Sequence, residues 1–290
     1  MDGREKECEE VGCVRIEDEN YPCLLKEIPD PPKHLYYKGN FCEEIFENCV
    51  AVVGSRKMSL YGKKVVEHLF STANKSMTIV SGFMSGVDAE AHSQALHFGM
   101  KTIAVMPCGI NYVHPEDQVG LYEKIIKQGG LILSEFESDF KPKLWTYPKR
   151  NRIVAGLSKV TVVVEASANS GSLITARLAN SYGRKVFVVP GSIFSDLSNG
   201  KIQINNEFAK TIGSGFQINE FLGLRCTTKS GNTDFDDQEN PILILLKNEP
   251  MTINELSEVL STDISELSME LTLLSLDGLV TEQGGKFYAC

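Results

Sequence analysis

One segment of the sequence concentrates cationic and large aromatic side chains. Five cations and two large aromatic residues, Trp145 and Tyr147, lie between Lys141 and Arg152. Lys and Arg neutralise phosphates, and an aromatic ring offers a base a stacking surface worth about 1–3 kcal/mol. Stacking requires a base that is not already inside a duplex, so this composition favours a single-stranded nucleic acid. The predicted contacts in this segment are Lys143, Tyr147, Lys149, Arg150, Asn151 and Arg152.

Other interpretations of this segment remain open. We expect it to be a loop that leads into Ile153–Leu157, and in that setting Trp145, the only Trp of the chain, is as well explained by burial as by stacking. Arg152 could pair with Glu135 or Glu165 instead of a phosphate. The remaining cations could form a solvated face.

Three short turns carry small residues that let an anion approach backbone N–H groups. They are Gly54-Ser55-Arg56, Ser81-Gly82 and Ser170-Gly171-Ser172, and each follows a predicted strand. A helix that begins at such a turn offers free N–H groups and a partial positive charge. Any one turn is explained equally well as an ordinary strand-to-helix connection with a Ser cap. Three such turns in one sheet favour a shared phosphate-binding rim.

Catalytic patterns are weak in this sequence. It contains no G-x-x-x-x-G-K-[ST] loop, and no G-x-G-x-x-G follows a strand. Asp88 and His92 are four residues apart, which fits a helix-surface pair or a capping Asp. Glu135 and Glu165 could form a carboxylate pair, or they could pair with nearby arginines. We therefore predict no catalytic residue, and the eight scattered cysteines, without a C-x-x-C pair, predict no metal site. No cofactor is expected.

Short β-branched runs alternate with longer amphipathic stretches through the middle of the chain. This alternation is typical of βα units and predicts a Rossmann-like α/β fold with a mostly parallel sheet. In such sheets ligands bind beyond the carboxyl ends of the strands. The predicted strands are Cys49–Val53, Met77–Val80, Thr102–Met106, Leu131–Leu133, Val160–Glu165 and Val186–Val189. The predicted helices include Val87–Phe98, Gly120–Gln128 and Ser172–Tyr182.

Charge is distributed unevenly along the 290 residues. The net charge is −9, yet residues 21–225 carry +5 and both ends are acidic. This asymmetry suggests an anionic ligand for the central region. Hydrophobic content is 42% and no apolar run could span a bilayer, so we expect no membrane association. The hydrophilic, acidic first residues do not resemble a secretory signal, which favours a cytoplasmic protein.

The last fifty residues predict a small winged-helix-like domain. Helices are expected at 241–247, from 252 and at 265–276, followed by a hairpin at 278–288. The net charge of residues 241–290 is −6, which should repel DNA, so we expect a protein-interaction or self-association role, or simple packing on the core. The predicted organisation is an acidic extension (1–20), a Rossmann-like DNA-binding domain (21–224), an acidic linker (225–239) and the winged-helix-like domain (240–290).

The order of the motifs resembles the DprA/Smf (DNA-processing protein A) family. The resemblance begins at Tyr21-Pro22 and continues to about Phe221. It implies a non-enzymatic protein that binds single-stranded DNA without sequence preference, forms a homodimer and helps to load the RecA recombinase during transformation or recombination. The motifs that carry it are Gly54-Ser55-Arg56, Ser81-Gly82 with Gly86-Val87-Asp88, Lys149-Arg150-Asn151-Arg152, Ser170-Gly171-Ser172 and Val189-Pro190-Gly191-Ser192.

One departure and one alternative accompany the resemblance. The loop 107–118 lacks the Gly-Gly and Tyr-Pro that the family more often shows. The alternative is a nucleotide-processing hydrolase on a related Rossmann-like fold, similar to the cytokinin-activating phosphoribohydrolases. The segment most similar to their Pro-Gly-Gly-x-Gly-Thr-x-x-Glu loop starts at Ser170. It lacks both the glycine run and the final Glu. A pure interaction scaffold would leave the cationic and aromatic segment unexplained.

Overall fold

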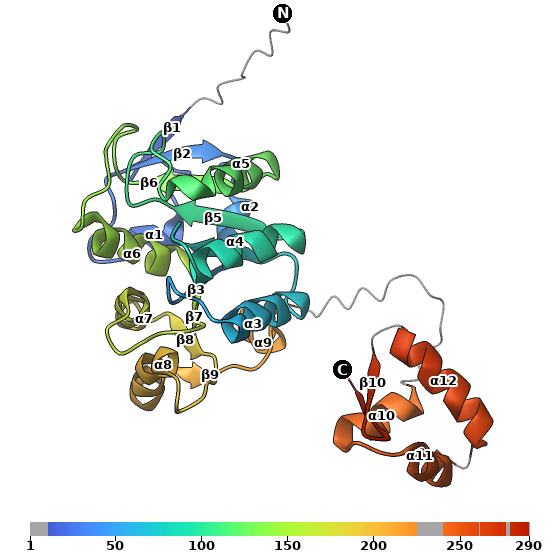
Figure 1. Ribbon diagram of the computed structural model, residues 1–290. Coiled ribbons are helices and arrows are strands. Elements are labelled where there is room, and N and C mark those ends of the chain that lie inside the picture. Colours follow the sequence, from blue (N-terminus) through green and yellow to red (C-terminus); the bar gives the residue numbers. More distant parts are fainter. Residues whose placement is uncertain (1–10, 225–239, 261, 277–278, 290) are drawn as a thin grey trace, which may run out of the picture. The chain divides into compact units, whose positions relative to one another are not determined.

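The chain folds into two compact units, Met1–Thr227 and Thr228–Cys290 (Figure 1). The computed structural model describes residues 11–224, 240–260, 262–276 and 279–289, and the structural statements below refer to these residues. The predicted linker, 225–239, lies outside the described residues. Each unit has its own apolar core.

A nine-stranded, mostly parallel sheet forms the centre of the first unit, in the order β1-β2-β6-β5-β4-β3-β7-β8-β9. Only the β1–β2 and β2–β6 pairings are antiparallel. β1 comes from the segment predicted as an acidic extension, and it pairs with β2 along its whole length. The strands are β1 (Gly12–Arg15), β2 (His34–Gly39), β3 (Cys49–Val53), β4 (Thr78–Ser81), β5 (Lys101–Val105), β6 (Leu131–Ser134), β7 (Val160–Val163), β8 (Lys185–Val188) and β9 (Lys210–Thr211).

Helices cover both faces of this sheet (Figure 1). Successive residues of β3 point to opposite faces, so Ala51 packs with α6 and α7, whereas Val50 and Val52 pack with α3 and α4. Burial on both faces explains why the central strands are apolar throughout. The helices are α1 (Cys23–Lys26), α2 (Glu44–Glu47), α3 (Leu60–Ser71), α4 (Val87–His97), α5 (Val119–Lys127), α6 (Thr146–Leu157), α7 (Gly171–Ser181), α8 (Asp196–Glu207) and α9 (Phe216–Leu222), with a short 3-10 turn at Glu116–Gln118.

The predicted Rossmann-like fold is confirmed, and the six predicted strands differ from the observed ones only at their ends. The predicted loop at 141–152 is wrong for its second half, because Thr146–Arg152 forms the first turns of α6. Pro148 obscured this helix in the sequence. A Pro is tolerated in the first turn, where backbone N–H groups have no partner within the helix, and burial of Ile153–Leu157 stabilises the rest.

The second unit has the predicted winged-helix order. It comprises α10 (Pro241–Asn248), α11 (Ile253–Leu260), α12 (Ile264–Leu276), β10 (Val280–Gln283) and β11 (Lys286–Ala289). Its core is an apolar cluster that includes Leu256, Leu267 and Leu271. A capping box starts α11, because the Thr252 N–H donates to the Glu255 carboxylate at 2.7 Å and the Glu255 N–H donates back to Thr252 Oγ1 at 3.3 Å.

Candidate nucleic-acid interface

A pocket of about 390 Å³ lies at the carboxyl ends of the central strands. The chain runs from β3 outward through β4, β5 and β6 and then returns to the other side of β3 as β7, so β3 and β7 flank the switch point where such sheets bind ligands. We call this cavity the strand-end pocket. The predicted residues that line it are Gly54, Ser55, Arg56, Gly82, Tyr147, Arg150, Asn151, Ser170, Gly171 and Ser172.

The turn after β3 forms one wall of the pocket. A Cβ atom at Gly54 would lie 2.6 Å from Val87 Cγ2, so only glycine allows α4 to pack this closely. The Ser55 hydroxyl closes the turn, since it accepts from Lys57 N at 3.0 Å and donates to Lys57 O at 3.1 Å. The Arg56 guanidinium then lies over the Tyr147 ring, 5.2 Å from its centroid.

Hydrogen bonds from buried polar side chains fix the turn after β4. Ser81 is buried and donates to Val52 O at 2.6 Å, so it shapes the turn and does not line the pocket. His92 Nε2 donates to Gly82 O at 2.7 Å, which fixes the carbonyl next to the pocket. Burial lowers the pKa of His92 to about 4, and the imidazole is therefore neutral at pH 7.

One face of α6 supplies the floor of the pocket. Tyr147, Arg150, Asn151 and Val154 all line the cavity, and their spacing of three and four residues places them on the same side of the helix. The Asn151 amide also donates to Gly171 O at 3.4 Å, which ties α6 to the start of α7. Helix geometry thus turns only part of this cationic motif toward the pocket: Arg150 lines it, whereas Lys149 and Arg152 do not.

Arg150 and Asp88 place opposite charges near each other in the pocket, and Arg150 donates to Val105 O and to Asn151 Oδ1. Both side chains are buried and both line the cavity. Burial lowers the pKa of Arg150 and raises the pKa of Asp88, and each charge opposes the shift of the other. Gly82 lies against this pair, because a Cβ there would be 2.3 Å from Asp88 Oδ2. Asp88 is therefore neither a surface residue nor a helix cap.

The N-terminus of α7 forms another wall of the pocket. Ser170 is the N-cap residue, and its hydroxyl lies 2.7 Å from the Ser172 hydroxyl and accepts from Ser172 N at 3.4 Å. The other N–H groups of the first turn and the helix dipole favour an anion at this position. Phosphate fits this chemistry.

Lys57 also lines the strand-end pocket, although the sequence did not predict it as a contact. The available signal was its position directly after Gly54-Ser55-Arg56. With Lys57 included, the pocket lining holds the cations Arg56, Lys57 and Arg150 against the single carboxylate Asp88. The lining therefore has a net positive charge, as anion binding requires.

The opposite face of α6 carries the remaining predicted cations away from the pocket. Arg152 is buried and pairs with Glu135 at 2.6 Å and with Asp30 at 3.2 Å. Lys149 Nζ lies 3.2 Å from the same Glu135 carboxylate. Of the two roles left open for Arg152, the structure supports the ion pair with Glu135.

Trp145 belongs to an aromatic cluster beside this face of α6, and Lys143 lies against the cluster. The Trp145 ring is half exposed and packs edge-on against Phe136 and Phe140, with ring centroids 5.8 Å and 6.2 Å away. Lys143 Nζ lies 5.3 Å from the Phe140 centroid. Neither Lys143 nor Trp145 lines the strand-end pocket.

Glu135 and Glu165 do not form a carboxylate pair. They follow β6 and β7, which are separated in the sheet by β5, β4 and β3. The buried Glu165 instead accepts from the Ser59 N–H at 2.9 Å and from the Ser59 hydroxyl, at the start of α3. Among the described residues no cluster of His, Cys, Asp or Glu could hold a metal ion, and no helix is long and apolar enough to cross a membrane.

The fold defines an α/β protein with a cation-lined pocket at the switch point of its sheet, followed by a unit with the winged-helix order. The family model for DNA recombination-mediator protein A matches residues 12–223, and the model for the DprA winged helix domain matches residues 228–286. The chain belongs to the DNA recombination-mediator protein A (DprA/Smf) family, as the sequence motifs predicted.

Individual relatives agree with this assignment. DNA processing protein DprA of Streptococcus pneumoniae is 42% identical over 213 residues, covering 73% of this chain and 75% of the relative. Protein Smf of Escherichia coli is 34% identical over 285 residues, covering 94% of this chain and 76% of the relative. The X-ray structure of the Streptococcus pneumoniae protein superimposes with a TM-score of 0.69 over 74% of this chain and 75% of that chain, at 40% identity. The structure of Helicobacter pylori DNA processing protein A, reported for its single-stranded DNA binding mode, gives 0.63 over 74% and 94%, at 32% identity.

Proposed function

We propose that this chain binds single-stranded DNA without sequence preference in the strand-end pocket and acts as a recombination mediator. The observation that carries the proposal is the Arg56 guanidinium over the Tyr147 ring, in a pocket that the N-terminus of α7 also lines. This arrangement offers a cation and free N–H groups to phosphate and a ring to a base. None of these groups reads a base edge, which is consistent with sequence-independent binding.

The same geometry favours a single strand over a duplex. The contacts converge within a pocket of about 390 Å³, into which one flexible strand can direct a phosphate and an unstacked base. The bases of a duplex are stacked on each other and are not free to stack on Tyr147. The buried Arg150–Asp88 pair supports the floor, so we assign Arg56 and Lys57 as the main phosphate contacts.

The finer parts of the proposal come from the family resemblance. We propose that residues 21–224 carry the DNA site, that residues 240–290 form a separate module joined by 225–239, and that the chain is a cytoplasmic homodimer that delivers bound DNA to RecA. The role is one of binding and not of catalysis. Light scattering coupled to size exclusion tests the dimer, and strand exchange by RecA on coated single strands tests delivery.

Fluorescence anisotropy of a labelled oligo-dT, measured across a salt series, tests the pocket directly. We expect Arg56→Ala to weaken binding about tenfold, because a charge-assisted contact to phosphate is lost. The slope of log K against log salt should fall by about 0.7 for one phosphate contact to a single strand. An unlabelled duplex of the same length should compete poorly.

Lys127→Ala is the matched control for charge. Lys127 lies on α5, outside the strand-end pocket, and its removal changes the net charge by the same amount. Equal losses in the Arg56 and Lys127 variants would mean that binding follows net charge alone, and the pocket assignment would then be wrong. No binding by the wild-type chain at low salt would reject single-stranded DNA as the ligand.

A further inference from the structure

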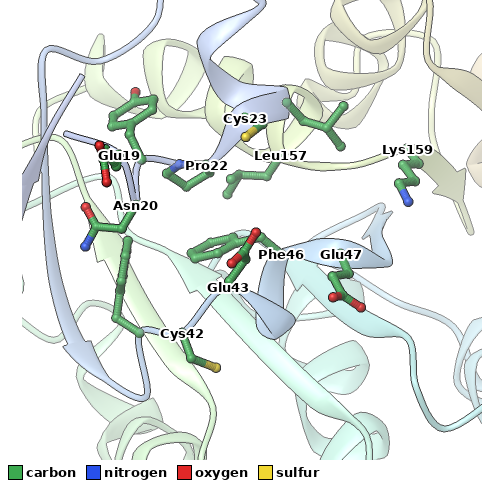
Figure 2. Close-up of a pocket in the computed structure, with 13 residues that line it drawn as sticks. Glu19, Asn20, Pro22, Cys23, Cys42, Glu43, Phe46, Glu47, Leu157 and Lys159 are labelled. Atoms are coloured by element: carbon green, nitrogen blue, oxygen red, sulfur yellow. The ribbon is translucent and has the colours of Figure 1, made fainter. Parts of the chain in front are cut away.

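A second cavity of about 330 Å³ lies at the amino ends of the strands, and we call it the amino-end pocket. Its walls come from the segment before α1 and the start of α1, from the segment around α2, and from the end of α6 with its connection to β7 (Figure 2). Apolar side chains supply much of the lining, including Pro22, Leu24, Phe41, Phe46 and Leu157. Neither the fold nor the proposed DNA site requires an open apolar cavity here.

The aromatic wall of this pocket is held in place by neighbouring rings. Phe41 stacks on Tyr37 with centroids 4.3 Å apart and meets the Phe46 ring edge-on at 5.2 Å. Figure 2 shows Phe46 between Leu157 and Pro22 on one side and Cys42 on the other. A wall fixed in this way can bind an apolar or planar group with little loss of side-chain entropy.

Carboxylates dominate the charge around the cavity. Glu19, Glu43 and Glu47 line it with a single cation, Lys159. The three carboxylates are exposed, and none of them takes part in an ion pair among the described residues. Lys159 Nζ lies 3.5 Å from the Asn48 side-chain oxygen. This potential repels phosphate, so the amino-end pocket is not a continuation of a DNA path.

We propose that the amino-end pocket binds an arginine and an adjacent apolar side chain from a partner polypeptide. A guanidinium stacks on an aromatic face and pairs with carboxylates, which matches Phe46 beside Glu43 and Glu47. The apolar neighbour of that arginine fills the space between Pro22 and Leu157. The acidic first ten residues of this chain and its acidic last fifty residues have the wrong charge to fill the site themselves.

Strand polarity keeps the two pockets apart. Leu157 and Lys159 precede β7, whereas Ser167 and Ser170 in the strand-end pocket follow it. A strand has its two ends at opposite edges of the sheet, so a polypeptide held at the amino ends leaves the carboxyl ends open for DNA. The chain can therefore hold both ligands at once, as a protein that brings a partner to a DNA strand must do.

Disulfide trapping tests the proposal, because Cys42 and Cys23 line the cavity as free thiols. The full chain is equilibrated, in excess 2-mercaptoethanol, with the mixed disulfide of 2-mercaptoethanol and acetyl-Cys-Leu-Arg-amide or with that of acetyl-Cys-Leu-Glu-amide. The protein thiolate exchanges into the probe disulfide and releases 2-mercaptoethanol, and labelling at each cysteine is measured by peptide mapping. We expect Cys42 to favour the Arg probe about fivefold, the effect of one to two exposed ion pairs. Cys13, an exposed thiol outside the pocket, should show no such preference.

Matched variants separate this site from general acidity. Glu43→Gln with Glu47→Gln should abolish the preference at Cys42, whereas Glu220→Gln should retain it, because Glu220 is exposed and does not line the cavity. Replacing Leu by Gly in the Arg probe should lower trapping about threefold through loss of apolar contact. Equal preferences at Cys42 and Cys13, or a preference that survives the double variant, would overturn the proposal.

Binding of oligo-dT to the Cys42-trapped chain tests the separation of the two sites. The affinity should match that of the untrapped chain, since the ligands occupy opposite edges of the sheet. A loss of DNA binding on trapping would contradict the inference even if the pocket accepts the probe. Failure of the untrapped chain to bind DNA would count against the proposed function alone and would leave the trapping result intact.

Discussion

The two compact units use charge in opposite ways. The first unit places Arg56, Lys57 and Arg150 around one pocket with a single carboxylate. Residues 241–290 instead contain two cations and eight carboxylates. Many winged helices place the side chains that contact nucleic acid on the third helix. Here that helix, α12, exposes Met269 and Leu273, with 70% and 57% of their surfaces accessible.

This contrast shows that the winged-helix fold alone does not establish a DNA site. Function depends on the side chains that a fold presents, and apolar and acidic groups on α12 suit a protein surface better than a phosphate backbone. In the first unit, by contrast, backbone turns, a helix N-terminus and cations converge on one cavity. The units should therefore respond differently to substitution, to pH and to changes of charge.

The largest difference should come from a glycine in each unit. Gly86 has φ +86°, and a Cβ there would lie 2.3 Å from Ser55 O, so Gly86→Ala forces a backbone clash at the pocket. Gly284 in the hairpin has φ +64° with nothing within 4 Å of its Cβ position. We expect Gly86→Ala to lower the free energy of unfolding of the first unit by about 3 kcal/mol or more, and Gly284→Ala to cost the second about 1 kcal/mol.

Urea titration, followed by signals specific to each unit, measures both effects. Trp145 reports on the first unit, and the far-UV change that does not follow the Trp145 transition reports on the second. Gly183→Ala serves as a control in the first unit, because φ there is +71° but the Cβ position is open. If the Gly86 variant is as stable as the Gly183 variant, the turn relaxes to accept the Cβ atom. Close packing then does not fix the geometry of the pocket.

Acid should destabilise the first unit through His92. Its folded pKa of about 4 lies below the ordinary histidine pKa of 6.5, so the unfolded chain binds the proton first as the pH falls. Stability from this group is complete above pH 6.5 and is lost progressively down to pH 4, by about 3 kcal/mol in total. The second unit contains no histidine and should not share this loss within that window.

His92→Gln tests the origin of the acid sensitivity. The variant should be less stable at pH 7, because the bond to Gly82 O changes, but its stability should be flatter between pH 6.5 and 4. His97→Gln is the control, since His97 lies on the same helix, α4, but is not buried. If stability depends on pH in the same way in the His92 variant and in the wild type, other groups cause the acid sensitivity.

The sequence predicted the architecture well because its signals are local and strong. The run Cys49–Val53 is apolar throughout, as a strand covered on both faces must be, and β3 has these same bounds. The glycine and serine turns after β3 and β7 were likewise visible, since each has a steric or capping requirement that few other residues meet. These turns make up two walls of the strand-end pocket.

The division of α6 into two faces could not be predicted, because the segment was interpreted as a loop. Helical spacing would have grouped Tyr147 with Arg150 and Asn151, and separated them from Lys149 and Arg152. The groups that these cations contact are also distant in sequence: Val105 O for Arg150, and Glu135 and Asp30 for Arg152. Such long-range pairs depend on tertiary packing, which a single sequence does not reveal.

Lys149→Ala should therefore weaken oligo-dT binding by less than about threefold, well below the effect of Arg56→Ala. Glu135 already pairs with Lys149, and the side chain lies on the face of α6 away from the pocket. Anisotropy at two salt concentrations measures this, and the salt slope should stay close to that of the wild type. If Lys149→Ala matches Arg56→Ala, the strand also contacts the second face of α6, and the aromatic cluster with Trp145 becomes part of its path.

The smallest effect should follow from placing cations on α12. Glu266→Lys with Met269→Lys gives the third helix the charge that a DNA-contacting winged helix presents. If the strand-end pocket alone holds the DNA, oligo-dT affinity at moderate salt should change by less than about twofold, because exposed charges outside the bound path are screened. A much larger gain would mean that DNA bound to the first unit already reaches α12. The acidity of the winged helix would then act to restrain binding, and the contrast between the two units would be one of regulation as well as of surface chemistry.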